Sequence, residues 1–271
     1  MHNTFVSLAV SSVALASSHA MSVLSVKFLD SQDTAWSATD VVGAPGYAQP
    51  NWNFLTTDWS GNAVNDAPLA NVINSLGNTN SVLQNVTYGG NSDPVHYDSA
   101  NTWRSGAGTA SPNNVLMNGY LDDGQDNQPY INLSLSSAVT GASIVLYFNG
   151  DGQNAPVGRY WLEEWTDPLV EGTVITDQVG IDSNLWSGTF TSAGTFSQTA
   201  TPTNVQVATG NYIVFDNITA KNIRIRGAGN GDPEDFGRGP INGFQLVTVP
   251  EPTSIGFLAL AGLGALRRRR A

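Results

Sequence analysis

The chain has 271 residues and no cysteine, and its 22 acidic residues against 11 basic ones give a formal net charge of −11 at pH 7. The missing cysteine excludes disulfides, thiol catalysis and cysteine metal sites. The negative charge argues against nucleic acid and anionic lipid as partners. This length is normal for one all-β sandwich or barrel, so we expect a single folded domain.

The first twenty residues have the pattern of a secretory signal peptide. Apolar residues between Phe5 and Ala16 are followed by Ser18-His19-Ala20, a cleavage site with small residues, which places cleavage after Ala20. The apolar stretch is not preceded by Lys or Arg, so the translation start lies upstream or the signal is atypical. A buried first strand is the alternative interpretation. Residues 1–20 are therefore predicted to form a signal helix that is removed on export.

Residues 21–249 alternate between short apolar runs and turn-forming clusters. In Tyr130–Leu135 every second residue is apolar, which is the period of a strand with one buried face. Clusters rich in Gly and Asn, such as 149–152 and 227–231, separate these runs. The pattern predicts an all-β fold, an antiparallel β-sandwich of the jelly-roll kind. The expected strands are 23–28, 130–135, 142–148, 158–165, 172–179, 185–191, 204–208, 211–215, 221–226 and 241–249.

One segment, from Asp66 to Gly77, has apolar residues at helical spacing, with Asp66 as a cap and Gly77 as a stop signal. The apolar residues are Leu69, Val72, Ile73 and Leu76. The segment is short and rich in Asn, so a helix of one or two turns and a loop with a strand stay as alternatives. The stretch 89–114 is too rich in Gly, Ser and Asn to assign.

The last 22 residues, 250–271, consist of three parts. The triplet Pro250-Glu251-Pro252 comes first, the apolar run Ile255–Leu266 follows, and Arg267, Arg268, Arg269 and Arg270 come last. An apolar helix of this length rises only about 18 Å, short of the roughly 30 Å hydrocarbon core of a membrane. The arginines favour the cytoplasmic side, which leaves everything before Pro250 outside. The prolines keep the junction extended and open to a protease.

In this order the triplet, the apolar run and the arginine cluster closely resemble the PEP-CTERM sorting signal. The resemblance implies a short C-terminal transmembrane helix and processing by exosortase, a membrane transpeptidase-like enzyme of Gram-negative bacteria. It also implies secretion to the cell surface or the exterior. The alternatives are a core helix and a nucleic-acid patch, and the second is disfavoured because residues 21–249 hold 7 basic and 21 acidic residues, a net charge of −14.

A second resemblance covers residues 23–248. The order of several segments resembles uncharacterised β-sandwich domains of secreted bacterial proteins, which are similar in outline to galactose-binding-like jelly rolls. This implies the fold and transfers no catalytic residue. The segments are Gly43–Trp52, Trp103, Met117–Asp122, Val145–Asp151, Gly210–Phe215 and Gly239–Val247.

Residues with catalytic chemistry are few. His96 is the one histidine of residues 21–249, and no Gly-x-Ser-x-Gly elbow accompanies it to suggest a catalytic triad. Glu163 and Glu164 are adjacent on an expected strand, so they point to opposite faces and cannot form the carboxylate pair of a glycoside hydrolase. We therefore expect a protein that is not an enzyme, with a hydrolase as the less favoured alternative.

Two acidic turns concentrate oxygen donors of the kind that calcium prefers. The better candidate holds Asp122, Asp123 and Asp126, and the other is Asp232-Pro233-Glu234-Asp235. Neither has the spacing of an EF-hand, and solvated acidic turns are the alternative. The cofactor expected from the sequence is at most a structural calcium ion.

Trp52 and Trp59 lie in polar sequence, where an exposed indole would stack on a sugar ring. The alternative for Trp52 is a buried anchor for a long loop. The sequence thus predicts a secreted cell-surface or extracellular-matrix protein with a structural or adhesive β-sandwich. The alternative is a carbohydrate-binding module for extracellular polysaccharide.

Overall fold

The computed structural model describes residues 22–30, 33–57, 71–79, 83–90, 101–104, 107–122, 129–135, 141–149, 158–164, 173–179, 196, 210–229 and 239–248. Residues Ser22–Thr248 form one compact unit. The predicted signal peptide, the sorting tail and the expected strands 185–191 and 204–208 lie outside the described residues.

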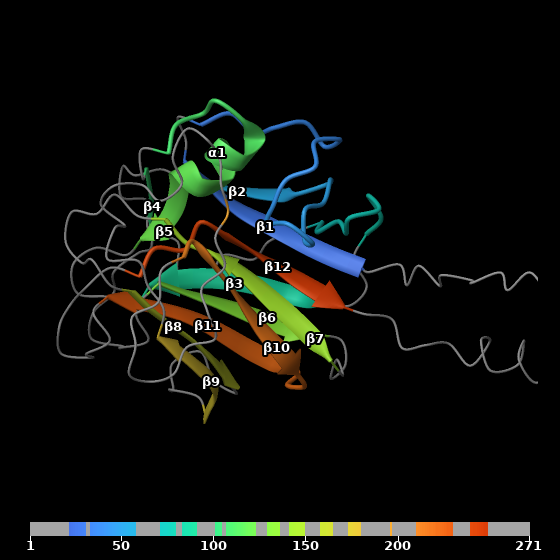
Figure 1. The fold of residues 1–271 in the computed structure, drawn as a ribbon. Coiled ribbons are helices and arrows are strands. Elements are labelled where there is room, and N and C mark those ends of the chain that lie inside the picture. The colour runs from blue at the N-terminus through green and yellow to red at the C-terminus, as the bar shows by residue number, and fades with distance from the viewer. Residues whose placement is uncertain are drawn as a thin grey trace, which may run out of the picture. The chain divides into compact units, whose positions relative to one another are not determined.

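The described structure is almost entirely β, which confirms the predicted all-β sandwich (Figure 1). Two five-stranded sheets have the orders β10-β7-β12-β1-β2 and β3-β6-β11-β8-β9, and β4 pairs with β5. The strands are β1 (Ser22–Asp30), β2 (Asn53–Thr57), β3 (Leu83–Gly90), β4 (Asn101–Arg104), β5 (Gly119–Asp122), β6 (Pro129–Leu135), β7 (Ala142–Tyr147), β8 (Gly158–Glu164), β9 (Thr173–Val179), β10 (Tyr212–Ile218), β11 (Asn222–Gly229) and β12 (Gly243–Thr248).

The first sheet joins the beginning of the described chain to its end. β1 pairs antiparallel with β12, from Ser22 opposite Thr248 to Lys27 opposite Gly243. On its other edge β1 pairs with β2, and this pairing is parallel. The β1–β2 pair is the parallel exception among the described strand pairs of the sandwich, and the long connection between β1 and β2 allows the chain to return in the direction of β1.

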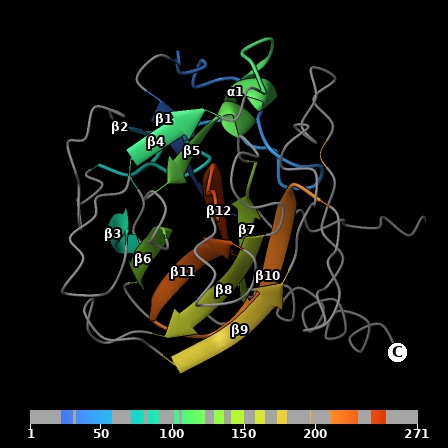
Figure 2. The ribbon, with the colours of Figure 1, turned by 90° about the vertical axis from the view of Figure 1, so that its left-hand side faces the viewer.

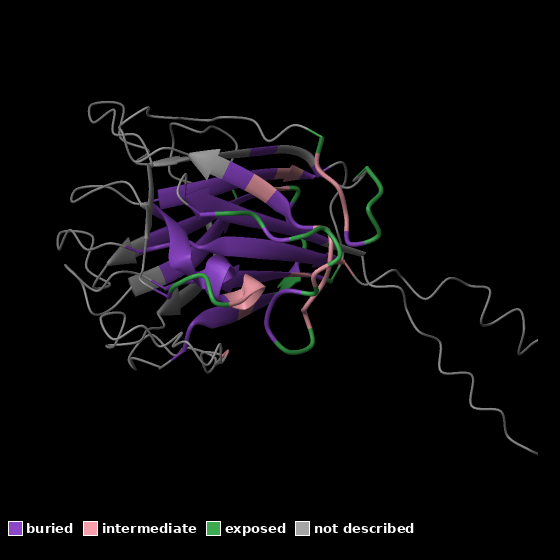
Figure 3. Cartoon of the chain, turned by 90° about the horizontal axis from the view of Figure 1, so that it is seen from above, coloured by how far each residue is buried: buried purple, intermediate pink, exposed green. Residues whose placement is uncertain are grey.

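The hydrophobic core lies between the two five-stranded sheets. Alternate residues of each strand point inward, as Val26 and Phe28 do in β1 and Ile223 and Ile225 do in β11, and all four are fully buried. Figure 3 shows the burial that continues along the strands of both sheets. Burial of each such side chain contributes about 1.5–3 kcal/mol to the free energy of folding.

The described helix, α1 (Pro112–Asn118), begins within the stretch 89–114 that the sequence left unassigned. Ser111 caps it, because its hydroxyl accepts a hydrogen bond from the backbone N of Asn114, and Pro112 fits the first helical turn. The helix contacts β1 and β5 and, together with the β4–β5 pair, lies where β1 ends (Figure 2).

The helical alternative for residues 66–77 is wrong in the part that is described. Residues 71–79 form turns, with an isolated bridge between Ile73 and Thr79. The side chain of Asn53 bonds both the backbone N and the backbone O of Ile73, at 2.9 and 2.8 Å, which holds this residue extended. Asn71 and Gly77 have positive φ angles of 57° and 77°, which no right-handed helix contains.

Among the described residues, no helix has both the length and the apolar character needed to cross a membrane.

Candidate functional site on the outer face of the second sheet

The strands β6, β11 and β8 carry polar and aromatic side chains on the sheet face opposite the core. The apolar residues of β11, Ile223 and Ile225, point into the core, so Arg224 and Arg226 between them point outward. The same alternation places residues of β6 and β8 on that face. We call the set the outer polar face: Tyr130, Asn132, Trp161, Glu163, Arg224 and Arg226.

The register of the three strands arranges these residues in two rows. Arg224 lies opposite Asn132 of β6 on one side and opposite Glu163 of β8 on the other. Arg226 lies in the same way between Tyr130 and Trp161. Directly opposed residues in antiparallel strands are close enough for side-chain contact, and diagonal neighbours are within reach of long side chains.

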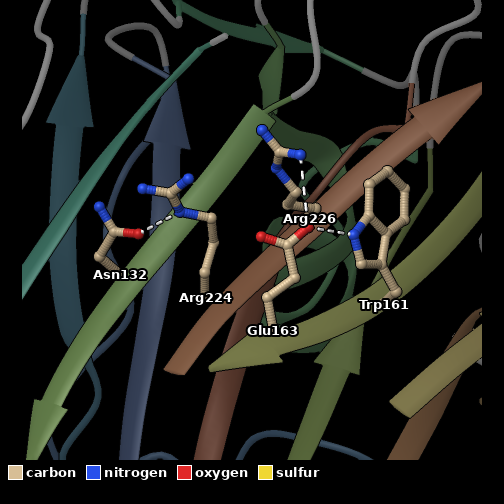
Figure 4. A network of polar contacts seen from close by, with 5 residues as sticks. All are labelled: Asn132, Trp161, Glu163, Arg224 and Arg226. Carbon is tan, nitrogen blue, oxygen red and sulfur yellow. Dashed lines mark hydrogen bonds and ion pairs between the residues drawn. The ribbon is translucent and has the colours of Figure 1, made fainter. Parts of the chain in front are cut away.

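Glu163 accepts hydrogen bonds from both Trp161 and Arg226. Its Oε1 accepts a hydrogen bond of 2.6 Å from the indole Nε1 of Trp161 and one of 3.3 Å from Nη1 of Arg226 (Figure 4). The guanidinium carbon of Arg226 also lies 5.7 Å from the centroid of the Trp161 ring, in cation–π range. One carboxylate thus fixes both an arginine and a tryptophan.

Arg224 makes the matching contacts on the β6 side. Its Nε donates to Oδ1 of Asn132 at 2.8 Å, and its guanidinium carbon lies 5.0 Å from the centroid of the Tyr130 ring. A planar guanidinium suits both contacts, because it donates in its plane and stacks on its face. Each arginine therefore has a hydrogen-bond acceptor and an aromatic ring as neighbours.

The six residues of the outer polar face are buried in spite of their polarity. Arg224 and Glu163 are fully buried, and Trp161, the most exposed of the six, retains 7% of its surface. The next residue of β8, Glu164, is exposed. The expectation that Glu163 and Glu164 point to opposite faces stays a prediction.

A second buried polar group lies where β1 meets the end of α1. The side chain of Lys27 is fully buried, and its ammonium donates to the backbone O of Gly119 and, at 3.4 Å, to that of Asn242. Burial lowers the pKa of Lys27 well below its usual value, while the carboxylates of Asp33 and Asp30 oppose that shift. A lysine with a lowered pKa is a common catalytic group, yet complete burial gives this amine no access to a substrate.

Asparagine side chains connect this lysine to α1. Nδ2 of Asn118 donates to both carboxylate oxygens of Asp33, at 2.9 and 3.0 Å. Nδ2 of Asn242 donates to the backbone oxygens of Met117 and Gly119 at the end of the helix. The group therefore anchors α1 to the first sheet.

Trp52, predicted as a sugar-stacking residue, retains 4% of its surface. Its Nε1 donates to the backbone oxygens of Val42 and Gln49, and its ring packs edge-on against Trp36 with centroids 5.6 Å apart. These contacts give Trp52 the role of a loop anchor, which was the alternative interpretation. The ring offers little free surface in this arrangement, and sugar binding there stays a prediction.

The remaining predicted site residues fall mainly outside the described part of the chain. Asp122 is the last residue of β5, where its backbone pairs with that of Asn101. Trp59, His96, Asp123, Asp126 and 232–235 lie outside the described residues. Within the described residues, no three His, Cys, Asp or Glu side chains gather as metal ligands would.

The fold places the chain among all-β sandwich proteins. Comparison with known families identifies the C-terminal segment. Residues 248–270 match the PEP-CTERM protein-sorting motif, as the order of triplet, apolar run and arginines predicts. The motif implies a secreted protein that is sorted to the cell exterior or surface by exosortase.

Among solved structures, the chain resembles two structures of an exo-β-1,3-galactanase from Phanerochaete chrysosporium with bound β-1,3-galactotriose. In both, the sequence identity is 11% and the TM-score is 0.27. Each match covers 65% of this chain and 32% of the galactanase, so the chain spans about a third of that enzyme. No curated protein matches the chain.

Proposed function

We propose that the β-sandwich is a non-catalytic structural or adhesive module, displayed at the cell surface or in the extracellular matrix after sorting. The observation that supports this most directly is the outer polar face. Its carboxylate, Glu163, is fully buried and accepts hydrogen bonds from Trp161 and Arg226. A carboxylate held in this way stabilises the position of its neighbours and is not presented to a substrate.

A buried lysine supports the same proposal. Lys27 of β1 is fully buried, and its Nζ connects β1 to the backbone oxygens of Gly119 and Asn242. Buried polar groups tend to rigidify a fold when their hydrogen bonds are satisfied. A rigid, cysteine-free domain is well suited to persist outside the cell without depending on an oxidising environment.

The test compares cells that produce the protein with cells that lack it. We expect loss of the protein to weaken cell–cell or cell–matrix attachment, and wild-type protein to restore it. Purified protein should release no sugar from the extracellular polysaccharide of its host. Release of sugar that is abolished in a Glu163→Gln variant of unchanged fold would contradict the proposal.

The second candidate function is carbohydrate binding. It is favoured by the row Tyr130, Arg226 and Trp161, which the register places side by side on one sheet face, with the guanidinium carbon of Arg226 5.7 Å from the centroid of the Trp161 ring. Aromatic rings stack on sugar faces and arginine donates to hydroxyl or carboxylate oxygens. Binding on a glycan array that is lost in Trp161→Phe, or in Trp52→Ala, would favour this function over a purely structural one.

A further inference from the structure

The first described strand begins where the last described strand ends. Ser22 at the start of β1 lies opposite Thr248 at the end of β12, in the terminal pair of their antiparallel ladder (Figure 1). The PEP-CTERM motif begins at residue 248, so the sorting signal starts where the strand ends. The predicted signal-peptide cleavage after Ala20 lies just before Ser22. Both processing junctions are therefore attached to one end of the sandwich.

The connection between β12 and the Pro-Glu-Pro triplet is very short. Val249 alone separates Thr248 from Pro250. An extended chain advances at most about 3.6 Å per residue, so the Cα atoms of Thr248 and Pro250 are at most about 7 Å apart. Pro250 has no N–H and cannot extend the strand ladder. Any enzyme that holds the triplet must reach it beside this end of the sheet.

The sheet cannot form fully without β12. This strand lies between β1 and β7, and its residues Phe244 and Leu246 are buried in the core. Gly243 at its start lies against β1, where a Cβ would be 2.6 Å from the backbone O of Val26. β12 therefore has a partner on both edges and a buried face. Once it pairs, the triplet extends from a folded sheet and no longer from an unfolded chain.

Neighbouring strand ends complete the surface around Thr248. Ser143 of β7 pairs with Val247, and Ile218 of β10 pairs with Ala142. The hydroxyl of Ser143 donates to Oδ1 of Asp216 at 2.6 Å. Thr219 and Lys221 follow in the turn to β11 and are exposed. We call this surface the processing rim: Gly141, Ser143, Thr219, Lys221 and Thr248.

We propose that the processing rim is the surface on which exosortase contacts the folded domain while the triplet occupies its active site. The short reach from Thr248 to Pro250 forces this contact, since the enzyme cannot bind the triplet and stay clear of the rim. The partner is a membrane-embedded protein, and the small or singly charged rim side chains leave room for its approach. The opposite end of the sandwich, with α1, is then directed away from the enzyme.

The test uses the full-length chain, whose lack of cysteine permits labelling at a single introduced thiol. Thr219→Cys places a label on the processing rim, and Thr109→Cys places one at an equally exposed threonine in the loop before α1. Each variant is labelled with a bulky maleimide polymer and incubated with exosortase in liposomes. Mass spectrometry then follows the loss of the tail. Lys221→Cys serves as a second rim site if the label at position 219 lowers the melting temperature.

We expect the rim label to slow processing about tenfold, a loss of roughly 1.4 kcal/mol, and the label at Thr109 to leave the rate unchanged. A flexible Gly/Ser insertion between Thr248 and Val249 should cancel the effect of the rim label, because the enzyme is then no longer held against the rim. Equal rates for labelled and unlabelled rim variants would overturn the proposal. So would equal slowing at both sites, or slowing that persists after the insertion.

Discussion

Arg226 and Glu163 form an ion pair across β11 and β8, with 3.3 Å between Nη1 and Oε1 and side chains that are 5% and 0% exposed. The pair is diagonal in the strand ladder, since Arg226 lies directly opposite Trp161. Removing one partner of a buried pair is more costly than the pair is stabilising, because the other charge is left uncompensated.

The first prediction therefore concerns Glu163→Gln. This change keeps the size of the side chain but removes the negative charge of the buried acceptor that Arg226 and Trp161 share, and it should lower the free energy of unfolding by about 3 kcal/mol. Urea unfolding measures the loss. The matched control is Glu164→Gln at the exposed end of the same strand, which should leave stability nearly unchanged. Equal effects of the two changes would show that the ion pair does not stabilise the sheet.

The second prediction is a pH dependence that originates at Lys27. Its pKa is lowered in the folded chain from the usual 10.5, so between the two pKa values the unfolded chain binds more protons. Stability must then rise as the pH increases toward 10.5, and it must fall as the pH drops through the folded pKa. Unfolding of wild type and Lys27→Met from neutral pH upward should show this rise in the wild type alone. Parallel profiles would contradict it.

The third prediction applies above pH 10 and has the opposite sign. Burial raises the pKa of Tyr160 well above its usual 10.0, and its hydroxyl donates to the backbone O of Pro240 at 2.7 Å. The folded chain holds this proton more tightly, so stability is fully present below pH 10 and is lost as the pH rises further. Tyr160→Phe should lower the free energy of unfolding at neutral pH by about 1–3 kcal/mol, and above pH 10 its stability should fall less steeply with pH than that of the wild type. A fall as steep as that of the wild type would assign the effect to other groups.

The fourth prediction tests the close approach of β12 to β1. A Cβ at Gly243 would lie 2.6 Å from the backbone O of Val26 and 3.3 Å from Cδ1 of Leu116. Gly243→Ala should lower the free energy of unfolding by about 3 kcal/mol or more, because backbone must move. Gly46→Ala is the comparison: a Cβ there has open space, and its φ of 87° costs about 1–2 kcal/mol. A smaller loss at Gly243 than at Gly46 would mean that the strands separate easily.

The fifth prediction is that calcium binds the acidic segment that holds Asp122, Asp123 and Asp126. Oxygen ligands close together in the sequence suit this ion. Calorimetric titration should show heat of binding and a higher melting temperature with calcium, and both should disappear when Asp123 and Asp126 are changed to Asn. No heat and no rise in melting temperature would leave the segment as solvated surface.

Local patterns predicted the strands well where one face is apolar. No tertiary information is needed to see the period of two in Tyr130–Leu135. The same holds for β11, where Ile223 and Ile225 alternate with arginines. The strands β2, β3, β4 and β5 and the helix α1 were not predicted. The signal for α1 was present, since Ser111 followed by Pro112 is a typical helix start, but the surrounding Gly, Ser and Asn obscured it.

The outer polar face was missed for a different reason. Outward-pointing arginines normally lie in solvent, and only the register of β11 shows that Arg224 meets Asn132, 92 residues away in the chain, and that Arg226 meets Glu163, 63 residues away. Such distant pairings depend on the whole topology. The sorting tail shows the opposite case, because its three parts are contiguous and could be recognised from the sequence alone.

The most direct test of the account is the mass of the protein recovered from outside the cell. Export and sorting predict a chain that begins directly after Ala20 and ends near Pro250-Glu251-Pro252, without Arg267–Arg270. Full-length chain in the cytosol, with both ends intact in cells that contain exosortase, would contradict the central claim.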